Sequence, residues 1–487
     1  MRKTVTLLLA AILLLAAAAA PAASARGGAV RAAQHLTYHK EPPAVEADER
    51  MAKEPDAEAE EDEDGAPVEI PDAETFSSYL PILLIDTEGQ IVPGGGEEKE
   101  HGQKILCSFS LFDGGGSNTL RDTPAVESAA LVGIRGHSSR AYPKKQYAVK
   151  LVGEDWAGNE QSLCGMAKGA SYIVNGSYID RTQIRNYLLY QVADAVMGNA
   201  PDARLCEMFL KDEDGKTEYM GLYTIIERIR VDRQHVVLTE FDPKRTENAA
   251  LVQINNTYDH YRIERLMAAE ASVYDYDLLY PDFIEMNEEQ LHYVESVLAA
   301  YEKSLMDIDA NPGGTAWMDR IDVDSFVDYF VINEFFQNYD AGSLSTFLYF
   351  DLDGVVHIGP VWDFDGAMNN NVGRWVPYDT IEMPKNMIYY YLCGSDVFTR
   401  LCRLRYQELR KTHLSEEYLL SSIGDCRAYL GGGIERNYAR WYRSGEETRY
   451  DRRRGTVEEE FEKLEEHVIE RGQWMDENIG KLSMLNG

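Results

Sequence analysis

The sequence is short of positive charge. It has 48 lysines and arginines against 82 aspartates and glutamates, which gives a formal net charge of −34 at pH 7. Such a chain repels the phosphates of nucleic acids and the headgroups of anionic lipids. We therefore expect no nucleic acid and no anionic lipid surface among its partners. Apolar residues still make up 44% of the chain, which is typical of a globular core.

Closely spaced cysteines are also missing. No two of the six cysteines form a CxxC pair, which argues against a zinc site. In an exported protein some of them could form disulfides, and buried free thiols are an equal alternative. They stand at Cys107, Cys164, Cys206, Cys393, Cys402 and Cys426.

Only one long apolar run is present, and it lies at the N-terminus. Residues 5–20 follow Arg2 and Lys3 and precede Ala23-Ser24-Ala25, which fits an A-x-A cleavage site. The pattern predicts a secretory signal peptide that is cleaved after Ala25. A membrane anchor fits less well because small residues dominate the end of the run, and no cysteine nearby supports a lipoprotein anchor. We expect a secreted, extracellular or cell-surface protein with no stable membrane span.

A strongly acidic segment follows. Residues 41–72 contain 14 acidic and two basic residues, a composition that cannot bury a core and predicts a disordered linker. Binding of Ca²⁺ or of a cationic surface is the less favoured alternative. The chain then divides into a signal peptide (1–25), an acidic linker (26–78), a main domain (79–420) and C-terminal helices that pack on it (421–487).

The most informative stretch is residues 333–365. A helix-like apolar run ends in a polar turn, and two strand-like runs at 346–350 and 355–358 flank an Asp-Gly turn. Two strands joined by such a turn form a hairpin. Because the ends of a hairpin lie close together, we expect Asp340, before it, and Asp363, after it, to be neighbours.

Two carboxylates brought together in this way, with Asn338 beside one of them, suit a divalent cation whose shell is completed by phosphate oxygens. They also suit a catalytic base that works beside a metal ligand. The alternative is structural: Asp340 and Asp351 cap turns, and Trp362 and Phe364 are core residues with solvated aspartates beside them. The spacing leaves both interpretations open.

A polar loop at residues 135–140 is a second candidate site. Glycine and serine allow backbone N–H groups to approach an anion, and the arginines at both ends of the loop suit phosphate. A basic hairpin turn is the alternative. The candidate phosphate contacts are Arg135, Ser138, Ser139 and Arg140.

Two adjacent lysines open the strand predicted at residues 144–151. The alternation of a strand places Lys145 on the side of the apolar residues and Lys144 on the opposite, more polar side. A lysine on a pocket-facing surface suits nucleotide phosphate, so Lys145 is favoured over Lys144. A solvated surface lysine is the alternative for each of them.

Two further segments frame these candidates. Asp180 is expected to cap a helix over residues 181–197, which carries no glutamate that could pair with the lysine. A strand over residues 219–226 runs into Glu227, which we expect to contact the nucleotide or to pair with Lys145. A salt bridge from Glu227 to a neighbouring arginine is the alternative.

The C-terminal half reads as mainly helical. Periodic apolar residues predict a helix over 288–305, a helix capped by Asp324, and a last helix over about 457–482. Residues 366–390 are expected to be loop, followed by two or three helices in all. Residues 240–300 are the least informative and are interpreted, apart from the helix, as a lid or a substrate-facing insertion.

Several short motifs, in the same order along the chain, resemble those of the spore coat protein H (CotH) kinase family. The resemblance covers roughly residues 79–420. It rests on Arg135 to Arg140 with Pro143-Lys144-Lys145, Arg185-Asn186, Tyr219-x-Gly221-x-Tyr223-x-x-x-Glu227, Asn338-Tyr339-Asp340, Ser345-Thr346-Phe347, Asp351-Leu352-Asp353-Gly354 and Gly359 to Asp365. One departure is His137, where the family usually has asparagine.

The resemblance implies an α+β fold of the atypical protein-kinase-like, two-lobed kind, with a β-rich N-terminal lobe and a mainly helical C-terminal lobe. By the same resemblance, Asp340 takes the catalytic position and Asn338 supports its loop. Asp363 is the metal ligand that the resemblance implies, and Asp365 is a second candidate ligand. Ser345 stands where a typical kinase has a metal-binding asparagine, and it is a weaker ligand, for which Asp365 or Asn369 would compensate.

The function implied is a secreted kinase that transfers the γ-phosphate of ATP to Ser or Thr of surface or spore-coat proteins, with Mg²⁺ or Mn²⁺ as cofactor. One alternative is a catalytically inactive scaffold that keeps the fold. Another is a secreted hydrolase that uses Asp340 and Asp363 as paired carboxylates. The hydrolase predicts neither the lysine strand nor the arginine and serine loop.

Overall fold

The computed structural model describes residues 69–95, 102–232, 235–255, 260–267, 275–370, 376–442 and 455–484. All of these residues belong to one compact unit, Glu61–Gly487. The predicted signal peptide and most of the acidic linker lie outside the described residues.

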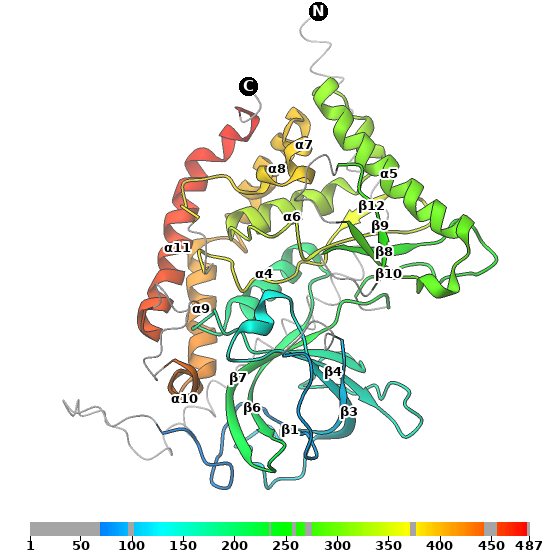
Figure 1. Ribbon diagram of the computed structural model, residues 1–487. Helices are drawn as coiled ribbons and strands as arrows, with labels where there is room; N and C mark the ends of the chain where they lie inside the picture. Colours follow the sequence, from blue (N-terminus) through cyan, green and yellow to red (C-terminus); the bar gives the residue numbers. More distant parts are fainter. Residues whose placement is uncertain are drawn as a thin grey trace, which may run out of the picture. The chain divides into compact units, whose positions relative to one another are not determined.

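Seven strands close into a barrel in the order β1-β2-β3-β4-β5-β7-β6 (Figure 1). Neighbours pair antiparallel except β1 and β6, whose parallel pairing closes the barrel. Alternate residues of β4 (Tyr147, Val149, Leu151) are buried in the barrel core, as strand alternation requires. The strands are β1 (Ile82–Asp86), β2 (Ile105–Phe112), β3 (Val126–Ile134), β4 (Tyr147–Val152), β5 (Ser171–Asn175), β6 (Ala203–Lys211) and β7 (Thr217–Glu227).

A second, five-stranded sheet has the order β12-β11-β8-β10-β9, and all of its neighbouring strands pair antiparallel. The predicted hairpin is confirmed as β11 and β12, and β11 also pairs with β8 along its whole length. Residues 240–300 therefore contribute three strands to a sheet that the sequence did not predict. The strands are β8 (Ala250–Ile254), β9 (Tyr261–Ile263), β10 (Tyr276–Tyr280), β11 (Thr346–Phe350) and β12 (Val356–Ile358).

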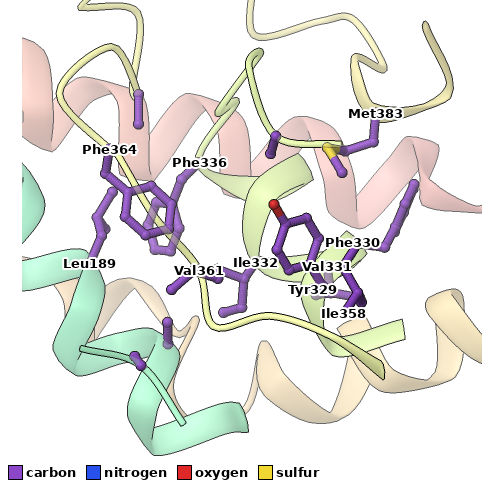
Figure 2. Packing of buried hydrophobic residues seen from close by; sticks show 14 of the residues in the cluster. Leu189, Tyr329, Phe330, Val331, Ile332, Phe336, Ile358, Val361, Phe364 and Met383 are labelled. Carbon is purple, nitrogen blue, oxygen red and sulfur yellow. The ribbon is translucent and has the colours of Figure 1, made fainter. Parts of the chain in front are cut away.

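Helices follow the strands and share one large apolar cluster with the second sheet. Figure 2 shows the part of this cluster where Leu189, Phe336 and Phe364 gather. Helices α9 and α11 lie against each other, and α10 packs on β7 of the barrel. The helices are α4 (Arg185–Met197), α5 (Glu288–Ala310), α6 (Val323–Phe335), α7 (Met387–Cys393), α8 (Asp396–Leu409), α9 (Glu416–Leu430), α10 (Gly433–Trp441) and α11 (Val457–Asn478).

Several boundaries differ from the sequence prediction. Helix α4 begins at Arg185 rather than at 181, because Gln183 has a φ of 61°, which a right-handed helix does not allow. Asp322, not Asp324, caps α6 by accepting a hydrogen bond from the amide of Ser325. The segment predicted as loop contains the start of α7, and more helices follow it than the two or three expected.

The described part of the chain is thus an α+β fold with a β-rich N-terminal region and helices later. None of the described helices combines the length and the apolar character needed to cross a membrane. All six cysteines fall within the described residues, and each is buried and free, so the free-thiol alternative holds over the disulfides.

Candidate functional site

The turn that carries Asp340 directly follows the C-terminus of α6. The backbone N–H of Asn338 donates to the carbonyl of Asn333 at 2.9 Å, and its side chain donates to the Asn333 side chain at 3.1 Å. Gln337 has a φ of 49°, and its amide group donates to the carbonyl of Pro377 at 2.8 Å. Asn338 is therefore a buried support of the turn, and Asp340, which follows it, is half-buried.

Tyr339 connects Asp340 with the acidic cluster beyond the hairpin. Burial raises the pKa of its phenol, and the nearby charges of Asp340 and Asp363, together with a hydrogen bond to Asp340, raise it further. The ring lies against Gly366, where an added Cβ would stand 3.0 Å from the Tyr339 ring. The hairpin thus brings Asp340 and Asp363 to the same tyrosine, as expected from its geometry.

Asp363 interacts with groups from the Gly/Ser loop at residues 135–140, from α4 and from the turn before the hairpin. Its pKa is raised by burial, and this rise is opposed by the positive charge of Arg135 and by hydrogen bonds from the Asp365 backbone and the Ser345 hydroxyl. Its own backbone N–H donates to the hydroxyl of Tyr190 in α4 at 3.2 Å. Ser345 is therefore a neighbour of Asp363, the residue to which the resemblance assigns the metal.

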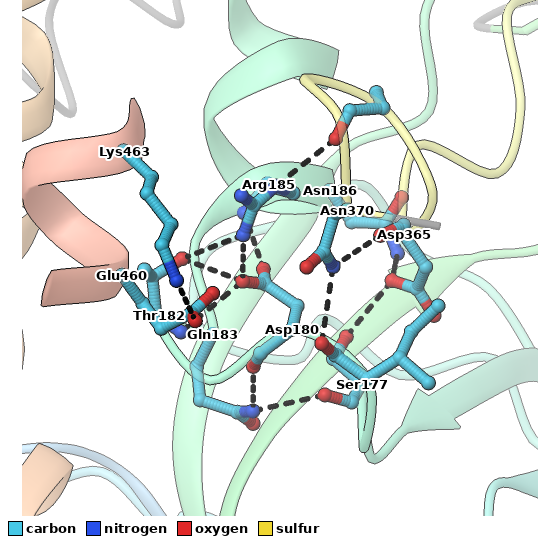
Figure 3. Close-up of polar contacts among 12 residues, drawn as sticks. Ser177, Asp180, Thr182, Gln183, Arg185, Asn186, Asp365, Asn370, Glu460 and Lys463 are labelled. Atoms are coloured by element: carbon cyan, nitrogen blue, oxygen red, sulfur yellow. Dashed lines mark hydrogen bonds and ion pairs between the residues drawn. The ribbon is translucent and has the colours of Figure 1, made fainter. Parts of the chain in front are cut away.

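Asp365 lies deeper than Asp363, in a polar network (Figure 3). Its carboxylate accepts hydrogen bonds from the Ser177 hydroxyl at 3.1 Å and from the side chain of Asn186 in α4. Burial, then the charges of Asp363 and Asp180, raise the pKa of Asp365 to about 8. Asp365 therefore holds its proton more tightly than an ordinary aspartate does.

The backbone around these groups is strained. Gln337, Ser345, Asp363, Met368 and Asn369 all have φ between 49° and 61°, although none is glycine. Conformations of this kind cost roughly 1–3 kcal/mol each and persist where surrounding contacts impose them, often at functional sites. Their concentration along 337–369 supports a functional interpretation of this segment.

One arginine of the loop at residues 135–140 interacts electrostatically with the acidic cluster, and the other binds backbone carbonyls in and near the loop. Arg135 follows β3 and faces Asp363, while its guanidinium donates to the side chain of Gln146 at 3.1 Å. Arg140 instead donates to the carbonyls of Gly94 at 2.8 Å and Ile134 at 3.0 Å, which stiffens the loop.

The two serines of the loop lie in a short 3-10 helix, Ser138–Ala141. Ser138 is exposed and Ser139 is half-buried against Gly136, whose φ is 108°. Residues Arg135, Ser138, Ser139 and Arg140 are thus brought to one loop, but only Arg135 is placed opposite Asp363.

The two lysines lie before the strand rather than in it, since β4 begins at Tyr147. Lys144 is completely buried, and its ammonium donates to the Leu222 carbonyl and, at 2.8 Å each, to the side chains of Gln183 and Asn437. Burial lowers the pKa of Lys144, while Asp180 and Asp365 act in the opposite direction.

Lys145 is half-buried and donates to the carbonyl of Arg140 at 2.7 Å. Its assignment to phosphate stays a prediction, because alternation within β4 does not extend to these two residues. The charge of Asp365 in the acidic cluster raises the pKa of Lys144 against the effect of burial, but the Lys144 ammonium already has three oxygen partners.

Glu227, at the end of β7, is completely buried and pairs with His235. The distance between His235 Nε2 and the Glu227 carboxylate is 2.7 Å, and Asp232 holds the other ring nitrogen at 2.7 Å. Burial lowers the pKa of His235, but the hydrogen bonds to Asp232 and Glu227 outweigh this and raise it overall. This partner was not among those considered for Glu227 from the sequence.

A divalent cation fits the chemistry of Asp363 and Asp365. Among the described residues no group of three or more His, Cys, Asp and Glu side chains could hold a metal by itself. Mg²⁺ at a phosphate site needs only one or two carboxylates, because phosphate and water oxygens complete its shell. Burial, together with the charge of Asp363, raises the pKa of Asp365, so a bound cation would take the place of the proton on this carboxyl group.

Two side chains of the site, Tyr190 and Ser177, were not singled out from the sequence, whereas Asn186 was named as part of a family motif. Tyr190 and Asn186 stand four residues apart on α4, and they bind the amides of Asp363 and Phe364 respectively. Ser177 precedes the helix and reaches Asp365. The spacing of four places Tyr190 on the same face of the helix as Asn186, and it was a usable signal.

The comparisons with known proteins agree with this geometry. A family model described as CotH kinase protein matches residues 132–475, a region that includes the loop at 135–140, the hairpin, the acidic cluster and most of α11. A search of curated proteins finds no match. Because the family model covers most of the chain, and because the motifs on which the resemblance rested lie within it, the protein belongs to the CotH kinase family.

Proposed function

We propose that the protein is an atypical protein kinase that transfers the γ-phosphate of ATP to a serine or threonine hydroxyl. The observation that carries the proposal is the convergence of Asp340 and Asp363 on Tyr339, with Ser345 and Arg135 on Asp363. Two acids of this kind, one half-buried and one held by a counter-charge, provide the base and the metal ligand of phosphoryl transfer.

Asp340 is the proposed catalytic residue. It orients the acceptor hydroxyl and takes its proton while the acceptor oxygen bonds to the γ-phosphorus and the bond to the ADP oxygen breaks. Tyr339 hydrogen-bonds Asp340 and keeps the carboxylate next to the cluster. Asn338, fixed to Asn333, sets the position of the turn.

Asp363 and Asp365 are the residues that would hold Mg²⁺ or Mn²⁺, with Ser345 as a hydrogen-bond partner of Asp363. The metal would neutralise the phosphate oxygens and the developing charge on the leaving group. Arg135 is placed to bind phosphate on the same side, and Lys145, Ser138 and Ser139 are further candidates. Glu227 is proposed to help shape the site by its buried pairing with His235.

The acceptor is proposed to be a surface or coat protein, since the predicted signal peptide places the enzyme among exported proteins. An inactive scaffold with the same fold is the outcome to be separated by experiment.

The test is transfer of label from ATP to a serine-rich acceptor by the chain without residues 1–25, in the presence of Mg²⁺ or Mn²⁺. Asp340→Ala and Asp363→Ala are the variants, and Asp353→Ala in the exposed hairpin turn is the matched control. Transfer by wild type and control, lost in both variants, supports the kinase. Nucleotide binding without transfer favours the scaffold, and no nucleotide binding at all refutes the proposal.

A further inference from the structure

Glu334 and Arg471 form a buried ion pair next to the candidate site. Both side chains are completely buried, although they come from α6 and α11, and the guanidinium binds the carboxylate. The carboxylate also accepts the backbone N–H groups of Glu382, at 3.0 Å, and Met383, at 2.7 Å. One carboxylate thus binds three donors from two other segments of the chain.

Arg471 uses its other terminal N–H groups on the backbone of the same region, while its buried Nε finds no hydrogen-bond partner among the described residues. Its guanidinium donates to the carbonyls of Tyr378, Thr380 (2.6 Å) and Glu334 (2.9 Å). The Glu334 carbonyl is also the acceptor for the amide of Gln337, at 3.3 Å, where the turn towards Asp340 begins. A single side chain of α11 therefore fixes the end of α6 and the segment 378–383 together.

The Asp340 turn and residues 382–386 form the walls of a small cavity. The cavity has a volume of about 110 Å³ and is lined by Tyr339, Ser343, Glu382, Met383, Lys385 and Asn386. Tyr339 is the residue that hydrogen-bonds Asp340, and Glu382 and Met383 are the residues whose amides Glu334 holds. The ion pair thus sets both the position of the Asp340 turn and the opposite wall of the cavity.

A buried ion pair is weak evidence of stabilisation, because the cost of removing both charges from water offsets their attraction. Its geometric effect is stronger, since the planar guanidinium imposes directions on every acceptor that it contacts.

We propose that Arg471 and Glu334 are positioning residues, through which α11 fixes the catalytic turn and the cavity next to it. The inference rests on the proposed kinase function for its catalytic consequence, but its structural consequence is independent of that function. Nucleotide binding, which involves Arg135 and the barrel loop, lies outside the contacts of the pair.

The chain offers a matched control in Arg265 and Glu302. Both side chains are almost completely buried, and Glu302 likewise binds an arginine together with two backbone amides, those of Leu266 and Met267. This pair joins α5 to the segment after β9 and none of its partners lines the site. Arg471→Lys and Arg265→Lys each keep the charge and remove the planar fork.

The experiment compares the two variants in hydrogen exchange and in kinetics. In Arg471→Lys we expect amide exchange of residues 336–345 to rise about tenfold, kcat to fall about tenfold or more, and nucleotide Kd to stay within about twofold. We expect Arg471→Lys and Arg265→Lys to lower the melting temperature by similar amounts. In Arg265→Lys, amide exchange of residues 336–345 stays at the wild-type rate.

Equal exchange of 336–345 in both variants and wild type overturns the inference. The inference is also overturned if Arg265→Lys, at an equal loss of stability, lowers kcat as much as Arg471→Lys does. If the wild type transfers no phosphate, the proposed function fails, but the exchange measurement still decides whether the pair fixes the turn. Should Arg471→Lys not fold, Glu334→Gln provides the same comparison, with Glu302→Gln as its control.

Discussion

The hydroxyl of Ser345 donates a hydrogen bond to the carboxylate of Asp363. By the family resemblance Ser345 stands where a typical kinase has a metal-binding asparagine, and in the structure it is a partner of Asp363, the aspartate proposed to bind metal. This bond lowers the pKa of Asp363, against the rise that burial causes.

Ser345→Ala should therefore weaken Mg²⁺ binding without unfolding the protein. Loss of a hydrogen-bond partner of a metal ligand typically costs about 10–100-fold in metal affinity or activity. The measurement is the Mg²⁺ dependence of phosphotransfer, and Ser343→Ala in the same loop is the control. An unchanged Mg²⁺ requirement in Ser345→Ala would show that the hydroxyl has no part in holding Asp363.

Substitution of Lys144 should lower mainly the stability, and substitution of Lys145 should weaken mainly nucleotide binding. Lys144→Met leaves the buried side-chain oxygen of Gln183 and the Leu222 carbonyl without this donor, while the Asn437 oxygen keeps the backbone N–H of Leu222. At about 1–3 kcal/mol for each buried group left unsatisfied, we expect the free energy of unfolding to fall by about 3 kcal/mol or more. Chemical denaturation measures this change.

Lys145→Met removes only the described bond to the Arg140 carbonyl, so its cost should be about 1 kcal/mol. If Lys145 contacts phosphate, nucleotide affinity falls at least about tenfold in this variant and stays near wild type in Lys150→Met, on β4. Loss of binding in folded Lys144→Met together with normal binding in Lys145→Met would reverse the assignment.

Local patterns predicted the hairpin, because the Asp-Gly turn and the β-rich runs on both sides are adjacent in sequence. The same reasoning placed Asp340 near Asp363; the charges of both aspartates raise the pKa of Tyr339, and direct contact between the two aspartates stays a prediction. The motifs also indicated the family, which the match to residues 132–475 confirms.

The second sheet was not predictable in the same way. Strand β8 pairs with β11, which lies about a hundred residues later in the chain, so no local signal specifies the pairing. The lysines were misplaced for a different reason: alternation holds inside β4, but Lys144 and Lys145 precede the strand, where the chain bends after Pro143. Asp180 is not the N-cap residue of α4, which is Ile184, yet its carboxylate accepts the backbone N–H of Arg185, the first residue of the helix, and also pairs with the Arg185 guanidinium at 2.5 Å.

The six cysteines should behave as buried free thiols. Burial raises the pKa of each; that of Cys107 is raised to about 12, and burial likewise holds Cys426 at about 12. Thiols that are both buried and protonated react slowly. We expect little reaction with a thiol reagent in the native protein and reaction of all six in denaturant without reductant. Fewer than six in denaturant would reveal disulfides.

Asp365 should make stability depend on pH and on Mg²⁺. Its folded-state pKa of about 8 lies above the ordinary value of 3.8, so the folded protein binds this proton more tightly than the unfolded chain does. Its contribution to stability is therefore present below about pH 4 and is lost as the pH rises through 8. In EDTA, Asp365→Asn should gain stability relative to wild type across this range, on the order of a few kcal/mol.

Mg²⁺ should reverse this loss in the wild type, because the cation replaces the proton at the ionised carboxylate. The difference in melting temperature between Mg²⁺ and EDTA is expected to grow from pH 5 to about pH 8 in the wild type and to vanish in Asp365→Asn. Asp353→Asn, which removes a carboxylate from the exposed hairpin turn, should keep the wild-type response. A Mg²⁺ effect that survives in Asp365→Asn would place the metal on Asp363 without Asp365.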